Sequence, residues 1–149
     1  MKDNFLRGTA AGFTGAVVMS VFDFILNLIP GINIELIFGI SKLFVPRSMT
    51  GTLAGSTVGL ISHLVCGILV GLVMLVILEI AGYDYLLAKG AIMGLASWFL
   101  LCGILGKALG LRMQDRFIDN LLIMLIHIPF GLTVVWFLDR FRPKPEVTG

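Results

Sequence analysis

Residues 48–78 read SMTGTLAGSTVGLISHLVCGILVGLVMLVIL, a stretch without a single charged side chain. A helix that crosses the hydrocarbon core of a bilayer needs about 20 consecutive apolar residues, and this stretch is longer. Charge-free stretches also cover residues 90–106 and 120–138. Over the whole chain, 58% of the residues are hydrophobic, 13% are charged and the mean hydropathy is +1.02. A soluble fold could not bury so much apolar surface, so the sequence predicts an all-α integral membrane protein.

The apolar stretches predict four transmembrane helices within a single membrane domain, residues 1–149. Pro30 and Gly31 end the first helix, because proline cannot continue a helix and glycine releases the chain. The segment that follows repeats apolar residues about every 3.6 positions but is too short to span, which predicts an amphipathic helix at the membrane interface. The predicted spans cover residues 8–29, 53–80, 86–109 and 120–138, the interfacial helix covers 33–44, and a tail covers 139–149.

The four predicted spans contain an internal repeat. The first and third spans each open with a basic residue and a glycine, followed by small residues four and seven positions after that glycine. The second and fourth spans each place a glycine four positions after a histidine, as His63 with Gly67 and His127 with Gly131. The pattern predicts two tandem helical hairpins, with spans one and two repeated as spans three and four.

Small residues recur at helical spacing in every predicted span. Helices in lipid associate through close backbone approach, because no hydrophobic drive acts between them there. We expect these glycines to pack helices within one chain, with a dimer interface as the alternative. The expected packing positions are Gly8, Gly12, Gly55, Gly59, Gly67, Gly71, Gly90, Gly94 and Gly131.

Basic residues predict the orientation of the four spans, which place both termini on one side. Loops rich in lysine and arginine stay in the cytoplasm. The side with the termini carries six such residues and the other side carries five. Three of the six form a dense basic cluster after the last span, and this cluster predicts cytoplasmic termini. The first set is Lys2, Arg7, Lys89, Arg140, Arg142 and Lys144, and the second is Lys42, Arg47, Lys107, Arg112 and Arg116.

Ionisable side chains inside the predicted spans are candidate functional residues, because polar groups are costly in hydrocarbon. His63 lies about ten residues into the second span and His127 about eight into the fourth, which puts both roughly 12 to 15 Å below the same surface. Asp23 lies roughly 9 Å below that surface, and Asn27 comes close to it. The sequence predicts that Asp23, Asn27, His63 and His127 form one polar cluster.

The sequence is compatible with three roles for the pair His63 and His127. In the first, each neutral imidazole bonds a helix neighbour, such as Asp23, Asn27 or the Leu125 carbonyl freed by Pro129, and locks the bundle. In the second, the pair and Asp23 form a proton or ion relay, since imidazole titrates near neutrality. In the third, the two histidines ligate the iron of haem b, with small residues making room for the porphyrin.

Cofactor binding has little support in the residue pattern. No arginine near the histidines would pair with haem propionates. A soft-metal site would use His63, His127, Cys66 and Cys102, but the two thiols are scattered and no CxxC pair is present. We therefore expect no bound cofactor or metal.

Other function classes are excluded by composition and by motifs. The net charge of +2 comes from short basic flanks, so nucleic acid is not an expected partner. The chain has no Walker loop, no HExxH and no pair of carboxylates within one span. We expect no enzymatic activity.

The Gly-x3-Gly openings at Gly8 and Gly90 and the His-x3-Gly patterns at His63 and His127 resemble those of a loosely defined group of small uncharacterised bacterial four-helix membrane proteins. The resemblance covers residues 8–138 and implies the bacterial cytoplasmic (inner) membrane, with no established activity. The expected function is that of a structural protein or accessory subunit. Its partners would be the lipid bilayer and other membrane subunits or copies of itself. The alternative is a transport or redox module built on Asp23, His63 and His127.

Overall fold

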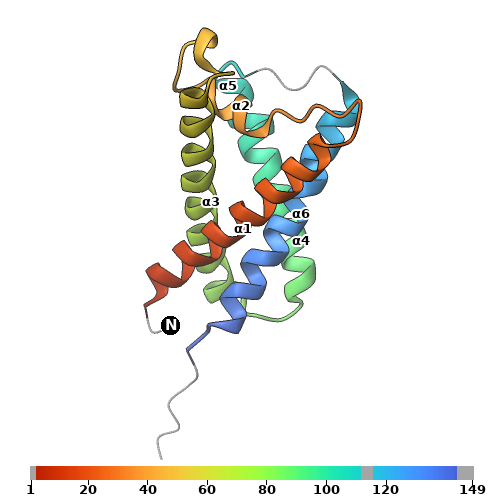
Figure 1. The fold of residues 1–149 in the computed structure, drawn as a ribbon. Helices are drawn as coiled ribbons and strands as arrows, with labels where there is room; N and C mark the ends of the chain where they lie inside the picture. The colour runs from red at the N-terminus through yellow and green to blue at the C-terminus, as the bar shows by residue number, and fades with distance from the viewer. Residues whose placement is uncertain (1–2, 112–115, 144–149) are drawn as a thin grey trace, which may run out of the picture.

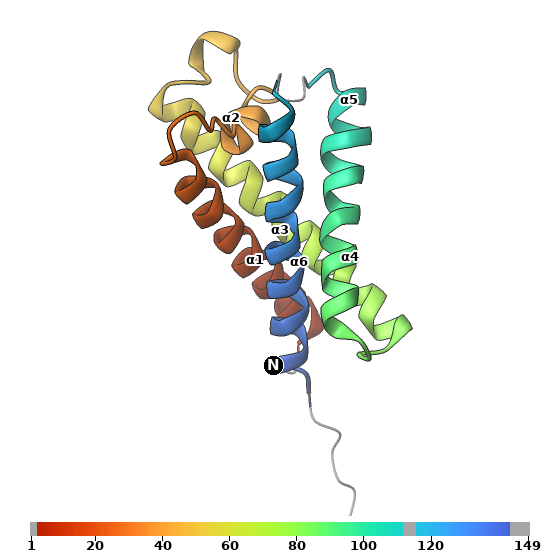
Figure 2. The same cartoon turned by 90° about the vertical axis from the view of Figure 1, so that its right-hand side faces the viewer.

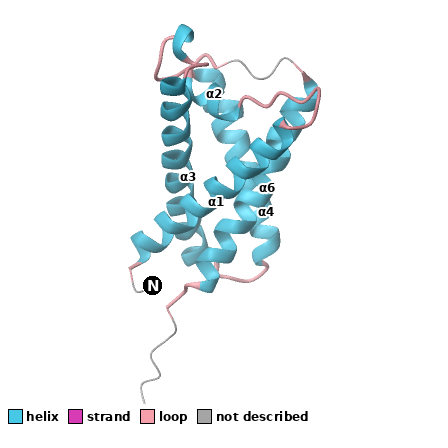
Figure 3. Cartoon of the chain, in the orientation of Figure 1, coloured by secondary structure: helices cyan, strands magenta, loops and turns pink. Residues whose placement is uncertain are grey.

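The protein is a helical bundle, seen in a computed structural model that describes residues 3–111 and 116–143. Every regular element in the described chain is a helix (Figure 3). Four helices are long and apolar enough to cross a membrane: Asn4–Asn27, Leu53–Ala81, Leu86–Ala108 and Phe117–Arg140. The prediction of an all-α protein with four membrane spans is confirmed. Lys2, Arg112 and Lys144, which entered the orientation count, lie outside the described residues.

The first two spans begin at side-chain caps. Helix α1 covers Asn4–Asn27, and the carboxylate of Asp3 accepts a 2.9 Å hydrogen bond from the Leu6 amide. Helix α3 covers Leu53–Ala81, where the Thr52 hydroxyl accepts a bond from the Gly55 amide. Each hydroxyl or carboxylate satisfies a backbone donor that the first helical turn leaves unpaired. Helix α1 starts before the predicted residue 8, and so includes Arg7.

The third span is a continuous rod with a change of helix type in its middle. It consists of α4 (Leu86–Trp98), a π-helical segment η2 (Phe99–Leu105) and a short α5 (Gly106–Ala108). A π-helix carries one extra residue per turn and is frequent at functional sites. The fourth span, α6, covers Phe117–Arg140 and passes through Pro129, so it is longer at both ends than the predicted 120–138.

The predicted interfacial helix is shorter than expected. Only α2 (Leu36–Ser41) is helical within residues 33–44, and a 3-10 turn, η1 (Arg47–Met49), follows. Both lie at the end of the bundle opposite the start of α1 (Figure 1). Helix α2 packs against α3, and its Leu36 and Ser41 are buried. The segment therefore closes one end of the bundle.

The helices pack as two hairpins joined by α1 and α6. Helix α1 packs against α3, α4 packs against α6, and α1 also packs against α6. The core between them contains Ala16, Met19, Met74 and Val134. The start of α1 and the end of α6 lie at the same end of the bundle (Figures 1 and 2).

The short link at residues 81–87 predicts that the second and third spans are antiparallel neighbours. Helices α3 and α4 are antiparallel, but the prediction that they pack as neighbours is wrong. The turn between them is short, and Gly82 at its start has a φ of 78°. Beyond this turn the two helices diverge (Figure 2), and they form no packed pair along their length. Instead, α3 packs against α1 and α4 packs against α6.

Candidate functional site

A seam of small residues brings the backbones of α1 and α3 into contact. A Cβ atom placed on Gly12 would collide with the Gly67 carbonyl, and one on Gly71 would lie 2.6 Å from the amide nitrogen of Gly12. A Cβ on Gly67 would meet the Ala16 methyl at 2.5 Å, while Gly8 faces Leu72. Larger side chains at Gly12, Gly67 or Gly71 would have to push the two helices apart.

A second seam joins α4 to α6. A Cβ on Gly94 would collide with the His127 carbonyl, and one on Gly131 would collide with the Gly90 carbonyl. A Cβ on Gly90 would lie 2.6 Å from Val135. These two seams hold α3 and α4 on opposite sides of the bundle, and so determine where a cavity forms between them.

The other two predicted packing glycines on α3, Gly55 and Gly59, face a different partner. A Cβ on Gly55 would collide with the Met49 carbonyl of η1, and one on Gly59 would collide with the Ile37 carbonyl of α2. On α3, Gly67 and Gly71 therefore pack against α1, whereas Gly55 and Gly59 pack against the segment that closes the bundle.

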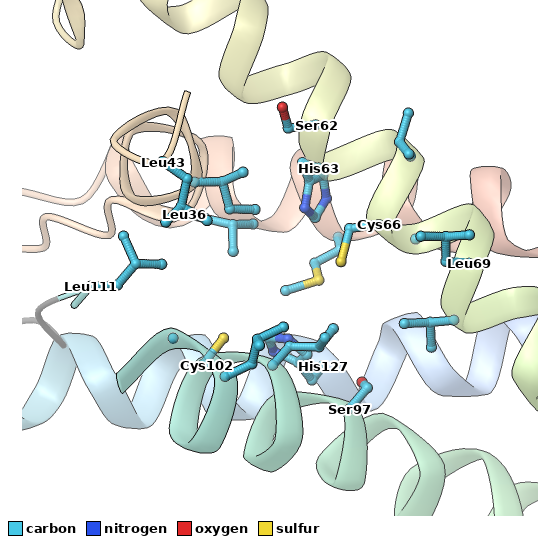
Figure 4. A pocket seen from close by; sticks show the side chains of 18 of the residues that line it. Leu36, Leu43, Ser62, His63, Cys66, Leu69, Ser97, Cys102, Leu111 and His127 are labelled. Atoms are coloured by element: carbon cyan, nitrogen blue, oxygen red, sulfur yellow. The ribbon is translucent and has the colours of Figure 1, made fainter. Parts of the chain in front are cut away.

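A cavity of about 440 Å³ lies between α3 and the third span, with α6 behind it and α2 at one end. Its wall is almost entirely apolar, and the polar side chains in it are Ser62, His63, Cys66, Ser97, Cys102 and His127 (Figure 4). The π-helical segment η2 supplies part of the wall, including Cys102. The volume falls in the range of small-molecule pockets, about 300–1,000 Å³.

Both histidines line this cavity, and each is anchored to a backbone carbonyl. His63 is 6% exposed, and its Nε2 donates a 3.2 Å hydrogen bond to the Ala16 carbonyl of α1. His127 is 5% exposed, and its Nδ1 donates a 2.7 Å bond to the Ile123 carbonyl one turn earlier. These partners differ from the predicted Asp23, Asn27 and Leu125. The His63 bond ties α3 to α1, which adds a polar link to the glycine seam.

Asp23 and Asn27 are not hydrogen-bonded to the histidines. The Asn27 amide donates to the Ile34 carbonyl at 3.1 Å, and its oxygen accepts from the Ile34 amide at 2.8 Å. This pair of bonds holds the chain between α1 and α2. Asp23 is buried, and its Oδ1 has no hydrogen-bond partner. The four predicted residues are thus divided between a histidine-lined cavity and the end of α1.

The cavity also brings together the two cysteines, which the sequence places far apart. Cys66 and Cys102 are free, half-buried thiols in its wall (Figure 4). Within residues 3–111 and 116–143, no three His, Cys, Asp or Glu side chains lie close enough to hold a metal ion together. Among the described residues that line this wall there is no lysine or arginine, so haem propionates would find no cationic partner among them.

A charged cluster that the sequence analysis does not predict lies at the other end of the bundle. The Arg7 side chain is fully buried, and its Nη2 donates to Glu79 and, at 3.2 Å, to the Tyr83 hydroxyl. The Tyr83 hydroxyl donates to Glu79 at 2.8 Å, and Arg142 lies 4.1 Å from the centre of the Tyr83 ring. Arg7 lies near the start of one helix of an antiparallel hairpin and Glu79 near the end of the other. Their opposite charges at the same end of the hairpin could have predicted this ion pair.

Burial raises the pKa of Tyr83 to about 12, and the hydrogen bond to Glu79 acts in the same direction. The neutral phenol is favoured because a phenolate beside a carboxylate would be repelled and poorly solvated. Tyr83 therefore remains a hydrogen-bond donor throughout the neutral range.

Comparison of the chain with protein-family models, curated proteins and solved structures finds no match.

Proposed function

We propose that this chain is a non-enzymatic integral membrane protein of the structural or accessory-subunit type. The observation that carries this proposal is the bonding of the two histidines. Each uses one ring nitrogen on a backbone carbonyl of the same chain. A buried imidazole held in this way satisfies a polar group in hydrocarbon and fixes the helices around it. The histidines then serve to keep the cavity wall in shape.

The hydrogen bonds in the spans argue against a proton relay. A relay needs donors and acceptors in a continuous chain, directly or through water. In the part of the chain that the structure describes, no hydrogen bond links Asp23 to either histidine. Several hydroxyl groups of the spans instead bond to backbone carbonyls one turn away, as Thr14 does to Ala10 and Thr133 to Pro129.

The proposal includes a repeated architecture built on Gly-x3-Gly packing. Gly12 of α1 lies against Gly67 of α3, and Gly94 of α4 lies against Gly131 of α6. In each hairpin the first helix brings the second residue of a Gly-x3-Gly pair to a glycine that follows a histidine by four positions. This correspondence supports two tandem copies of one hairpin.

The proposal also includes the bacterial cytoplasmic membrane, with both termini in the cytoplasm. The basic residues after α6 support this orientation. Partners would be lipid and other membrane subunits or further copies of the chain. Co-purification from native membranes, followed by identification of the bound proteins, tests the accessory role directly.

The structural role of the histidines is tested by replacing them with alanine. His63→Ala leaves the Ala16 carbonyl without its side-chain donor, and His127→Ala does the same for Ile123. We expect each to lower stability in detergent by about 1–3 kcal/mol, as measured by denaturant titration. Ser62→Ala is the matched control, because Ser62 shares the cavity wall. Variants that stay fully stable but lose a cellular phenotype or an ion flux would refute the structural role.

A second candidate is a transport or redox module. One observation favours it: His63 and His127 line the same cavity, and each keeps one ring nitrogen outside the bonds described above. The tests are the Soret absorption and metal content of the purified protein, and proton flux into liposomes. Four helices barely enclose a pathway, so transport would require an oligomer. A Soret band or a flux that depends on both histidines would favour this candidate over the first.

A further inference from the structure

A second, cationic pocket adjoins the apolar cavity at the end of the bundle that α2 closes. It measures about 300 Å³, and Lys42, Arg47 and Thr50 supply its polar side chains. None of the described residues in its wall carries a carboxylate. The apolar cavity and this pocket share the side chains of Leu43, Leu109 and Leu111. The two spaces therefore adjoin at these three residues, with the apolar cavity on one side and two basic side chains on the other.

The charges of this pocket are placed to receive an anion. Arg47 is exposed, and its guanidinium takes part in no ion pair or hydrogen bond within the described chain. Lys42 is partly exposed and pairs with Glu35 at 2.6 Å, which leaves its other ammonium protons for a further acceptor. Both residues follow α2, and the opposite wall is the end of the third span at Leu109. The pocket thus lies at the ends of the spans, at the level where lipid headgroups meet water.

The apolar cavity opens toward the surrounding lipid. It lies between α3 and the third span, which do not pack against each other along their length. Figure 4 shows apolar side chains facing one another across it, among them Leu36, Leu43, Leu69 and Leu111. A space of this kind in hydrocarbon is filled by the apolar chains around it, because an empty apolar space forfeits dispersion contacts on every side.

We propose that the two pockets form one binding site for an anionic membrane lipid, with an acyl chain in the apolar cavity and a phosphate headgroup on Lys42 and Arg47. The occupant needs both parts, since a neutral lipid would leave Arg47 without a counter-charge and Lys42 with Glu35 alone, and a free phosphate would leave the cavity unfilled. This inference adds a ligand to the structural role proposed above and does not depend on it.

The test uses the full chain, purified in detergent and delipidated. Phosphatidylglycerol and phosphatidylcholine with identical acyl chains are added in turn, and inorganic phosphate is the third probe. Native mass spectrometry counts the lipids retained, and thermal unfolding reports stabilisation. We expect phosphatidylglycerol to be retained and to raise the melting temperature, phosphatidylcholine to do so weakly, and inorganic phosphate to have no effect.

Charge variants separate the proposed site from general attraction of acidic lipid. A basic residue near a membrane surface contributes about 1 kcal/mol to anionic lipid binding, a factor of about five. Lys42 stays shared with Glu35, so Lys42→Gln with Arg47→Gln should lower the preference for phosphatidylglycerol about tenfold. Lys107→Gln is the matched control, because Lys107 lies on α5 near the same end of the bundle but outside the wall of the pocket.

A volume variant tests the acyl-chain half of the site. Cys66→Phe places a ring in the cavity and should reduce the retention of both lipids. Val73→Phe adds the same ring on the exposed outer face of α3 and should leave retention unchanged. Equal binding of the two lipids to the unmodified chain would overturn the proposal. An effect of Lys107→Gln as large as that of the double variant, or unchanged retention in a folded Cys66→Phe, would do so as well.

Discussion

Removing the carboxylate of Glu79, at the end of the bundle where α1 begins, should destabilise this protein. Arg7 is fully buried, and its Nε and Nη1 have no hydrogen-bond partner. Glu79 is the one carboxylate paired with it in the described chain. The variant Glu79→Gln keeps the size of the side chain but leaves the buried guanidinium without its counter-charge.

The size of the effect follows from the burial of the two partners. Breaking a fully buried ion pair costs about 3–5 kcal/mol, whereas an exposed pair contributes about 0.2–1 kcal/mol. The Arg7 side chain is 0% exposed and the Glu79 side chain is 43% exposed, so the pair lies between these limits. We expect Glu79→Gln to lower the free energy of unfolding by about 2–3 kcal/mol. Arg7→Met removes the buried charge together with the need for a partner, and should cost less than about 1 kcal/mol.

A double-mutant cycle measures this coupling. The single variants and Arg7→Met/Glu79→Gln are unfolded in detergent micelles by titration with a denaturing detergent, with helix content as the readout. The double variant should be no less stable than Arg7→Met alone, because Glu79 acts through Arg7. Asp84→Asn, which removes an exposed carboxylate from the same turn region, is the control. If Glu79→Gln lies within about 0.5 kcal/mol of the unmodified chain, the guanidinium does not depend on Glu79 and the reasoning is refuted.

Three further outcomes can be checked by the same unfolding assay. Gly94→Ala should lower the free energy of unfolding by about 1–3 kcal/mol, because its methyl meets the backbone of α6. Gly103→Ala has only Phe99 nearby, at 3.8 Å, and should leave the free energy of unfolding unchanged or raise it by up to about 1 kcal/mol. The pKa of Tyr83 is about 12 in the folded chain and near 10.0 in an ordinary tyrosine, as in the unfolded chain, so the free energy of unfolding should fall as pH rises between these values. Tyr83→Phe should remove that part of the fall. Asn27→Ala leaves the buried Ile34 backbone without two partners and should cost about 1–3 kcal/mol; an unchanged value would show that the link between α1 and α2 contributes nothing.

The four spans could be predicted because the surroundings of the chain set a length and a polarity that each span must meet. The stretch at residues 48–78 is far longer than a buried strand and carries no charge, unlike a long helix of a soluble protein, and Pro30 with Gly31 ends the first span. Span limits were less accurate. Helix α1 begins at Asn4 because Asp3 caps it, and a charged residue such as Arg7 can lie inside the helix when a partner pairs with it.

Packing between the spans could not be deduced from the connections. A four-residue turn between α3 and α4 predicts neighbours, but the collisions at Gly94 and Gly67 show that each helix lies closest to its own hairpin partner. The cavity results from that choice, which the length of the turn does not reveal. The π-helical segment η2 is likewise absent from the residue pattern, since apolar residues at Phe99 and Leu100 suit either helix type.

The candidate polar cluster was predicted from depth alone, and depth does not specify direction around a helix. His63 and His127 share a level and also share the cavity. Asn27 faces the chain that leads to α2, where the Ile34 backbone needs a partner. The partner of each polar side chain depends on which backbone groups the irregular segments leave unpaired, and those appear only in the folded chain.

The two glycine seams also bear on how the protein is made. Each seam joins spans that follow one another along the chain, α1 with α3 and α4 with α6. The first hairpin can therefore close in the bilayer while the ribosome is still translating the second. The contacts between the two hairpins, α6 with α1 and α6 with α3, must wait for the last span to be inserted, so final assembly of the protein consists of docking one hairpin onto the other.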